Sequence, residues 1–270
     1  MKRISLTAIA IAFTATSAVA GGHCAAGKTL TDGKLTVATG NPAYYPWVMD
    51  DAPESGKGFE AAVAYAVAAE MGFAGDDVVW VRSSFDEAIQ PGVKSFDVNM
   101  QQFSITPERD QIVDFSLPYY AAPMAVLLAG NASGTAPTMD GLKSLLWGAV
   151  GTTTAVPMLT DTIQPDRNPL LYGDNADVTA AMQAGQIDAA LFDLPTALYL
   201  SAVVVEGSSI LGQFPASRSE NPDQFGMLME EGSPLKACVD EAITALAASG
   251  ALEAIEAEWL QQTTGVPLIQ

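Results

Sequence analysis

One arginine lies where the sequence gives little local reason for a positive charge. Arg109 follows Thr106-Pro107, a pair typical of an N-cap and a first helical position. A helix N-terminus is the positive end of the helix dipole, so a cation there is disfavoured by about 0.3–1 kcal/mol unless an anion is near. A guanidinium can clamp a ligand carboxylate with two parallel hydrogen bonds. The alternative is pairing with one of the nearby acids, Glu108, Asp110 and Asp114.

A second charged residue ends an apolar strand. Residues 187–192 form an almost wholly apolar run, and Asp193 follows it directly. A carboxylate at the C-terminal end of a buried strand lies where open α/β sheets bind their ligands. Pro195 starts the next helix, so the alternative is that Asp193 or Leu194 simply caps that helix.

Two further segments could contact a ligand. Gly151-Thr152-Thr153-Thr154 turns from a predicted strand into a helix, and such turns direct N–H groups at anions, although most are ordinary caps. Residues 40–47, Gly-Asn-Pro-Ala-Tyr-Tyr-Pro-Trp, gather aromatic rings on a turn, where a ligand could stack. For Trp47, covering the end of the core is the alternative.

The elements that must position these residues follow from hydrophobic periodicity. Phe59, Val63, Val67 and Met71 recur every four residues and predict an amphipathic helix that ends at Gly72. Predicted strands at 35–39, 78–81 and 96–100 alternate with helices, which indicates a parallel sheet with helices on its faces. The second of these helices begins with a capping box at 84–87, where Phe85 could act as a hydrophobic staple. The pattern restarts at a strand over 124–129.

Composition narrows the class of protein. The chain has 270 residues, of which 49% are hydrophobic, and this is enough for one large or two medium globular domains. Its net charge of −19 argues against binding to nucleic acid or to anionic lipid. Solubility, in a medium whose salt screens self-repulsion, explains so much acid.

The first twenty residues have the pattern of a signal peptide. Lys2 and Arg3 precede an apolar run at 4–18, and Ala18-Val19-Ala20 provides a cleavage site. The run is too short to span a bilayer, and no later segment is long and apolar enough to do so. We therefore expect an exported, soluble protein, which loses two positive charges and no acid on cleavage.

The cysteines and the single histidine exclude several chemistries. Cys24 and Cys238 are expected to form a disulfide in an oxidising compartment, and a lipid anchor on Cys24 is the alternative. His23 lies beside the cleavage site, so no Ser-His-Asp or Cys-His arrangement is available. We find no zinc-ligand spacing, no phosphate-binding loop and no dinucleotide motif. We predict no cofactor, no metal site and no catalytic residues.

Residues 104–120, SITPERDQIVDFSLPYY, resemble the signature of the family-3 periplasmic solute-binding proteins, the amino-acid receptors of ABC importers. By order of elements the resemblance extends from about Leu35 to Leu260. It implies an α/β, two-lobed type II periplasmic-binding-protein fold, with mixed, mainly parallel sheets and two hinge strands near 120–124 and 212–216. After a signal peptide at 1–20, lobe 1 would comprise 21–122 and 216–270, and lobe 2 would comprise 123–215.

The resemblance also implies a function. The protein would be a periplasmic monomer that captures an amino acid by hinged closure of its lobes and delivers it to a membrane permease. Arg109 would bind the α-carboxylate together with Ser104 and Thr153. Asp193 would bind the α-ammonium, with the carbonyl of Gln102. A dehydratase-like enzyme and a ligand-sensing module on the same fold are the alternatives.

Four residues would contact the ligand side chain: Tyr44 and Phe85 would pack against it, and Asn41 and Gln101 would contact its polar tip. Two positions depart from the family, since Gln101 and Gln102 stand where small residues are usual. Asn41 stands where relatives that bind cationic amino acids often have an acid, which favours a neutral ligand.

Overall fold

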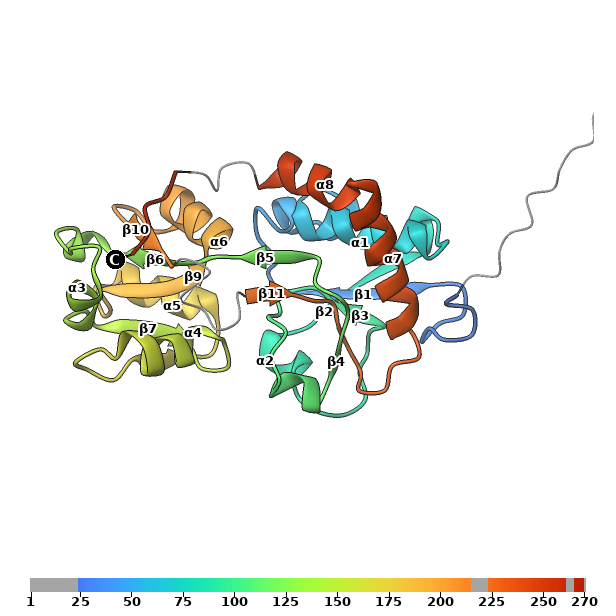
Figure 1. Ribbon diagram of the computed structural model, residues 1–270, viewed down its shortest axis with the longest axis horizontal. Helices are drawn as coiled ribbons and strands as arrows, with labels where there is room; N and C mark the ends of the chain where they lie inside the picture. The colour runs from blue at the N-terminus through green and yellow to red at the C-terminus, as the bar shows by residue number, and fades with distance from the viewer. Residues whose placement is uncertain (1–23, 215–222, 261–264, 270) are drawn as a thin grey trace, which may run out of the picture.

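The computed structural model describes residues 24–214, 223–260 and 265–269 and arranges them in two lobes (Figure 1). Each lobe contains a five-stranded sheet with helices around it. The predicted signal peptide at 1–20 and His23 lie outside the described residues. Among the residues that are described, no helix has the length and apolar character needed to cross a membrane.

The first lobe has a mixed sheet in the order β2-β1-β3-β12-β4. The strands are β1 (Leu35–Thr39), β2 (Val78–Arg82), β3 (Val98–Asn99), β4 (Asp114–Phe115) and β12 (Leu228–Met229). β1 runs parallel to β2 and β3, as predicted, whereas β12 inserts antiparallel between β3 and β4. A segment from late in the chain therefore completes the sheet of the first lobe.

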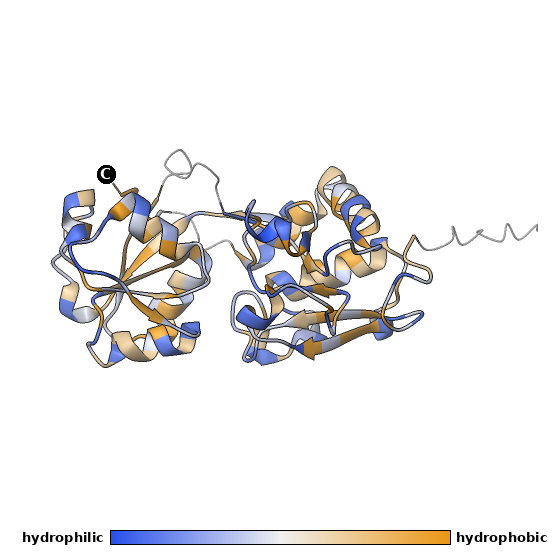
Figure 2. Cartoon of the chain, turned by 90° about the horizontal axis from the view of Figure 1, so that it is seen from below, coloured by the Kyte–Doolittle hydropathy of each residue, from blue (hydrophilic) through white to orange (hydrophobic). Residues whose placement is uncertain are grey.

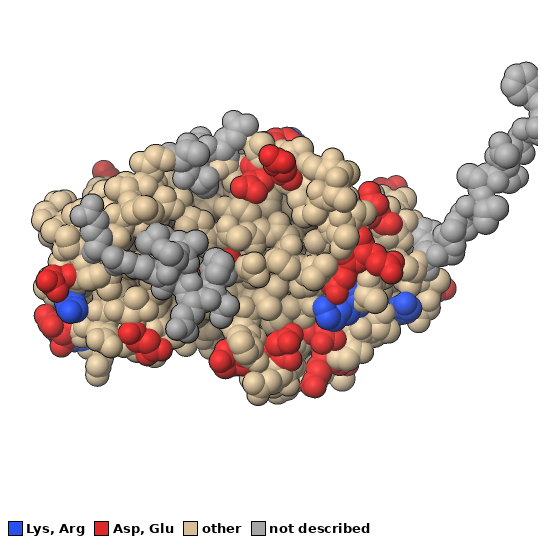
Figure 3. Space-filling view, in the orientation of Figure 1, with Lys and Arg blue, Asp and Glu red and all other residues tan. Residues whose placement is uncertain are grey.

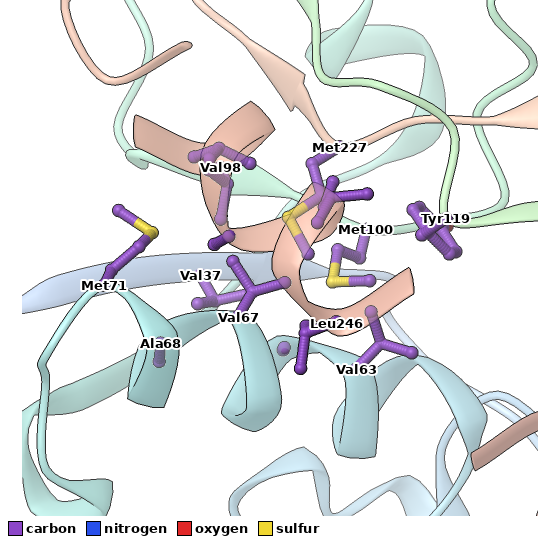
Figure 4. Packing of buried hydrophobic residues seen from close by; sticks show 14 of the residues in the cluster. Val37, Val63, Val67, Ala68, Met71, Val98, Met100, Tyr119, Met227 and Leu246 are labelled. Carbon is purple, nitrogen blue, oxygen red and sulfur yellow. The ribbon is translucent and has the colours of Figure 1, made fainter. Parts of the chain in front are cut away.

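The helices of the first lobe are α1 (Phe59–Glu70), α2 (Phe85–Ala88), α7 (Lys236–Ser249) and α8 (Ala251–Trp259). The predicted stripe of α1 is confirmed as core, because all four of its residues are at most 2% exposed. Figure 4 shows Val67 of α1 and Leu246 of α7 in one cluster with Val37 of β1. Burial of each such side chain contributes about 1.5–3 kcal/mol, which fixes α1 and α7 on the sheet.

The second lobe has a sheet in the order β10-β6-β9-β7-β8. The strands are β6 (Met124–Leu128), β7 (Trp147–Val150), β8 (Leu170–Tyr172), β9 (Ala189–Asp193) and β10 (Ser209–Gln213). β7 is parallel to β8 and β9, and β6 is antiparallel to β9 and β10. Figure 2 shows hydrophobic strands enclosed by helices with polar outer faces.

Helices of the second lobe are α3 (Met139–Lys143), α4 (Ala155–Pro157), α5 (Asn175–Gln183) and α6 (Leu194–Tyr199). Asp174 caps α5, because its side chain accepts a hydrogen bond from the Asp177 N–H at 2.8 Å. Short 3-10 helices occur at Met49–Asp51, Pro53–Ser55, Gly75–Asp77, Arg109–Gln111 and Gly130–Ala132. Short π-helices occur at Met158–Ile163 and Leu200–Val204.

The described residues show one direct crossing between the lobes and a tail that lies beside the second lobe. β5 (Tyr120–Ala122) leads through Pro123 into β6, and it pairs antiparallel with β11 (Asp223–Phe225). The predicted crossing at 212–216 lies partly outside the described residues. The tail at 265–269, which the sequence analysis assigned to the first lobe, lies beside β10: Gln213 N donates to Pro267 O, and Ile269 N donates to Gln213 O, both at 2.9 Å.

The predicted disulfide is confirmed. Cys24 and Cys238 are joined with their Cα atoms 5.6 Å apart, and the link ties the first described residue to α7. Cys238 is 2% exposed within the core of the first lobe. The lipid anchor considered for Cys24 required a free thiol there, so the structure supports the disulfide.

Candidate ligand-binding site

A cavity of about 430 Å³ lies between the two lobes. Its walls come from the loop after β1, the start of α2, the segment after β3, the turn after β7 and the end of β9. Every residue for which the sequence analysis expected a ligand contact lines this cavity: Asn41, Tyr44, Phe85, Gln101, Gln102, Ser104, Arg109, Thr153 and Asp193. Their roles toward a ligand stay predictions.

Arg109 is 9% exposed and begins a short 3-10 helix rather than occupying the third position of an α-helix. The N-cap of this segment is Glu108 and not the predicted Thr106, although the Thr106 hydroxyl accepts the Arg109 N–H at 3.3 Å. The guanidinium donates to the Ser104 carbonyl and, across the cleft, to the Thr152 carbonyl, each at 2.8 Å. Burial lowers the Arg109 pKa, and the nearby Asp223 carboxylate opposes this change.

The charges of Asp223 and Glu108 act on Arg109, but the ion pair required by the alternative explanation is not formed. Among the ion pairs of the described residues, none joins Arg109 to Glu108, Asp110 or Asp114. Its guanidinium instead lies 5.4 Å from the centre of the Phe85 ring, a cation–π distance. Phe85 in turn stacks on Phe103 with ring centres 4.5 Å apart, so the first turn of α2 supports the arginine.

The position of Asp193 is compatible with a ligand contact and with a role as helix cap. It ends β9, lines the cavity and caps α6, since its Oδ1 accepts the Thr196 N–H at 2.7 Å. Burial raises the pKa of Asp193 to about 6, the Thr196 hydrogen bonds lower it in part, and the Asp223 charge raises it further. A cation placed in the cavity would stabilise the ionised carboxylate.

Thr153 lines the cavity, but its own donors turn away from it. Both its N–H, at 3.2 Å, and its hydroxyl, at 2.8 Å, donate to the carbonyl of Val150. The strand-to-helix turn exists as predicted, between β7 and α4. In this conformation the turn uses those donors to hold itself together.

The two glutamines, whose role the sequence left open, are held by protein groups. The Gln101 amide donates to the Asn99 side chain at 2.8 Å. Gln102 has a φ of 54°, a left-handed conformation that is uncommon outside glycine. Its main-chain N–H donates to Glu60 Oε1 at 2.8 Å, and its side-chain amide donates to Glu60 Oε2.

Glu60 is a cavity residue that the sequence analysis missed. It is 1% exposed, and it also accepts a hydrogen bond from the Tyr119 hydroxyl. Burial raises its pKa to about 7, although the donors from Tyr119 and Gln102 pull it downward. The one sequence signal was an acid directly after Phe59, at the start of an otherwise apolar helix.

Asp223 is a second missed acid, and it lies near the expected carboxylate end of the cavity. The Ser104 hydroxyl hydrogen-bonds its carboxylate, and the Thr154 hydroxyl donates to its Oδ2 at 3.3 Å. Burial raises the Asp223 pKa, and the charge of Arg109 lowers it in part. Asp223 therefore shares Ser104 and the field of Arg109 with any ligand carboxylate.

Several contacts close the cavity directly between the lobes. The Trp47 indole donates to the Thr196 hydroxyl at 2.7 Å, and the rings of Tyr45 and Tyr199 lie 5.6 Å apart. The Asn175 side chain hydrogen-bonds the hydroxyl of Tyr44. Trp47 also covers the core, as its alternative explanation required, because it packs against three rings: those of Phe59, Tyr120 and Phe225.

More acidic than basic residues line the cavity. Among the described residues that line it, Arg109 is the only lysine or arginine, whereas the acids are Glu60, Asp86, Asp174, Asp193 and Asp223. Figure 3 shows the same imbalance on one outer face, where acidic side chains spread over both lobes and basic ones are few. In the described part of the chain, no group of three or more His, Cys, Asp or Glu could hold a metal ion.

The sequence is similar to those of named bacterial binding proteins. It is 29% identical over 167 residues to the L-cystine-binding protein TcyJ of Escherichia coli K12, covering 62% of this chain and 60% of that protein. It is 25% identical over 219 residues to the L-arginine-binding protein of Pseudomonas aeruginosa, covering 79% and 83%. The chain thus spans about 60% of the length of the cystine-binding relative.

The fold has close structural counterparts. An ancestral arginine-binding protein bound to glutamine superposes with a TM-score of 0.70 at 24% identity, covering 86% of this chain and all of that one. The model of the bacterial extracellular solute-binding proteins, family 3, matches residues 35–262. The type II periplasmic-binding-protein fold expected from the sequence is confirmed. This chain belongs to family 3 of the bacterial extracellular solute-binding proteins.

Proposed function

We propose that the protein is the periplasmic amino-acid receptor of an ABC importer, acting as a monomer that passes its ligand to a membrane permease. The observation that carries the proposal is that Arg109, from the first lobe, and Asp193, from the second, line the same cavity. Burying two opposite charges is costly unless each is paired, so a zwitterion that pairs both favours the closed form. The relatives named for L-cystine and L-arginine support this ligand class.

The α-carboxylate binds at Arg109. A guanidinium carries five N–H donors, and the carbonyls of Ser104 and Thr152 account for two hydrogen bonds. The remaining donors can take a carboxylate. Ser104 and Thr153 add donors once a ligand carboxylate displaces their present acceptors, the Asp223 carboxylate and the Val150 carbonyl. The α-ammonium binds at Asp193, with the Gln102 carbonyl as a second acceptor.

The side chain of the ligand lies between Tyr44 and Phe85 and reaches Asn41 and Gln101. The charge balance of the cavity favours a side chain that carries a further positive charge. Five acids and one arginine of the described residues line the cavity, so its field attracts a cation. This consideration outweighs Asn41, which by itself suggested a neutral ligand.

The test is to identify the bound molecule and measure its affinity. Mass spectrometry of protein purified under native conditions, followed by a thermal-shift screen of the amino acids, should yield ligands that raise the melting temperature, because they bind only the folded state. Calorimetry should then show weaker binding of the decarboxylated and deaminated analogues. Equal affinities for ligand and analogues would refute the proposal.

Two controls separate the alternatives. Arg109→Met should abolish the thermal shift, whereas Arg167→Met should not, because Arg167 pairs with Asp188 and neither residue lines the cavity. An enzyme on this fold would instead release a chemically altered product. Recovery of the bound amino acid unchanged after prolonged incubation is the result expected of a receptor.

A further inference from the structure

A hydrogen bond between the lobes ends on a residue that holds Asp193. Trp47, in the loop after β1, donates its indole N–H to the hydroxyl of Thr196 in the first turn of α6, at 2.7 Å. The two residues are 149 positions apart, and they are 1% and 2% exposed. Bulk water therefore does not replace either partner while the lobes are closed.

The hydrogen-bond chemistry gives this contact a direction. An indole N–H can only donate, and a threonine hydroxyl has one proton to give. Thr196 accepts from Trp47 and also hydrogen-bonds the Asp193 carboxylate with its side chain. The Thr196 hydroxyl proton must therefore point at Asp193, which receives the Thr196 main-chain N–H as well.

We propose that Trp47 and Thr196 are positioning residues that couple closure of the lobes to the orientation of the Asp193 carboxylate toward its ligand. The ammonium role of Asp193 belongs to the proposed function, and this inference rests on it. The direct link between the lobes joins two protein side chains. It belongs to the protein alone and can be measured without any ligand.

Opening and closing of the lobes changes the hydrogen bonds that Trp47, Thr196 and Asp193 can make. Trp47 is held rigidly, because its ring packs at 5.8–5.9 Å against Phe59, Tyr120 and Phe225. When the lobes separate, the indole stays with the first lobe and Thr196 moves with the second. The Thr196 hydroxyl then has no donor from Trp47 to orient it, and Asp193 loses a fixed hydrogen bond.

The hydrogen bond from the Thr196 hydroxyl is important for Asp193 because the charged groups around this carboxylate do not stabilise it. The other titratable groups that act on it or feel its charge are all acids or phenols: Glu60, Asp223, Tyr44, Tyr119 and Tyr120. No cation of the protein is among them in the described residues, so Thr196 is the main group that stabilises the ionised carboxylate. Loss of its hydroxyl should raise the Asp193 pKa, since a donor to the charged form is removed.

The experiment uses the full mature protein and the amino acid that the thermal-shift screen selects. Thr196→Val keeps the shape of the side chain and removes the hydroxyl, and Thr196→Ser restores the hydroxyl. Trp47→Phe removes the indole donor together with part of the ring volume, so its control must lose the same volume. The matched control is Trp147→Phe, because Trp147 is also fully buried and donates its indole N–H at 3.0 Å, but to Leu142 within the same lobe.

We expect Thr196→Val to weaken binding by about 3- to 10-fold at pH 7, the range for one net hydrogen bond. The pH at which binding is half-lost should also rise relative to the wild type. Thr196→Ser should restore both values. Trp47→Phe should show the same direction, and the double variant should be no worse than Thr196→Val alone, because the two residues act through one chain of hydrogen bonds.

Small-angle scattering of the ligand-free proteins gives the second readout. Thr196→Val and Trp47→Phe should both have a larger radius of gyration than the wild type, whereas Trp147→Phe should not. If no amino acid binds the wild type, the proposed function fails, and the scattering result alone decides the coupling between the lobes. Unchanged scattering, or an unchanged pH profile together with unchanged affinity in Thr196→Val, would overturn the inference.

Discussion

The two walls of the cavity each bury a carboxyl group, and the two groups have different partners. Glu60, on the first-lobe wall, accepts two hydrogen bonds from Gln102 and one from Tyr119, all within its own lobe. Asp193, on the second-lobe wall, receives its hydrogen bonds from Thr196 and its own main chain. Burial raises both pKa values, to about 7 and about 6.

This difference separates an acid that shapes the wall from an acid that can take a ligand. Three donors around Glu60 satisfy most of what a carboxylate can accept in a confined space, and they hold Gln102 in its left-handed conformation. The donors to Asp193 come from Thr196 in the first turn of α6 and from its own main chain, as expected of a helix cap. A raised pKa is thus shared by both residues, and the arrangement of donors is what distinguishes them.

The largest expected effect is on ligand binding when Asp193 loses its charge. Asp193→Asn should lower the affinity for the amino acid by at least about 30-fold at pH 7.5. The substitution leaves the ligand ammonium buried without its counter-ion. Calorimetry measures the change. Asp140→Asn on α3, where the aspartate side chain is 95% exposed, is the matched control and should bind normally. A change below threefold would contradict the role given to Asp193.

Replacing Glu60, the acid on the first-lobe wall, should lower the stability of the fold. Glu60→Met should lower the free energy of unfolding by at least about 1–3 kcal/mol, because buried donors of Gln102 and Tyr119 lose their acceptor. Urea unfolding measures this, with Glu70→Met at the exposed end of α1 as the control. Should Glu60→Met be as stable as Glu70→Met, the distinction between the two acids would fail.

Acid should weaken binding through Asp193. Because its pKa in the free protein is raised to about 6, the carboxyl is mostly protonated at pH 5, and the ligand must displace that proton. Affinity should therefore fall by about 10-fold between pH 7 and pH 5. A calorimetric titration series checks this. A flat profile over that range would show that Asp193 is ionised throughout or does not face the ligand.

The same pKa values predict how the free protein responds to pH. The unfolded chain releases the protons of Asp193 and Glu60 at lower pH than the folded chain does, so their contribution to stability falls as pH rises from about 4 to about 7. Asp193→Asn should reduce that fall. Thermal unfolding of ligand-free protein across this range, compared with Asp140→Asn, measures the difference.

The smallest effect concerns the charge of the ligand. Asp223→Asn removes a carboxylate that shares Ser104 with the ligand, so neutral amino acids should gain about threefold in affinity and cationic ones should lose about as much. Competition binding with a matched neutral and cationic pair measures the ratio. An unchanged ratio would mean that Asp223 does not contribute to selection by charge.

Much of the site could be predicted because its residues follow recognisable local patterns. Arg109 comes after a threonine and a proline, and Asp193 ends an apolar strand. Parallel strands of one sheet have their carboxyl ends at one edge, so residues at those ends gather there. The motif at 104–120 then supplied the family and with it the second lobe's contribution.

Residues set by tertiary contacts could not be found in this way. Periodicity described one face of α1, whereas the loop at 44–48 also covers its start: Phe59 N donates to Pro46 O, and Glu60 N donates to Trp47 O. That cover is what buries Glu60. Asp174 and Asp177 are both acceptable caps by composition, and only the course of the loop before α5 selects Asp174.

The tail shows the same limit at longer range. Residues 265–269 reach β10 because Gly212 leaves room there: a Cβ at Gly212 would lie 2.7 Å from Ile269 Cδ1. Nothing in the local sequence around Gly212 indicates which segment will fill that space. Such complementarity belongs to the packed structure, and the pattern of hydrophobic residues does not reveal it.

The bond between Cys24 and Cys238 turns most of the polypeptide into a single covalent ring. A protease that cuts once anywhere inside that ring leaves one molecule, because the fragments stay attached through sulfur. The first lobe, which takes its strands and helices from both halves of the chain, would therefore survive a nick in the second lobe as a joined unit. In an environment rich in proteases, reduction of one bond would decide whether such damage is tolerated.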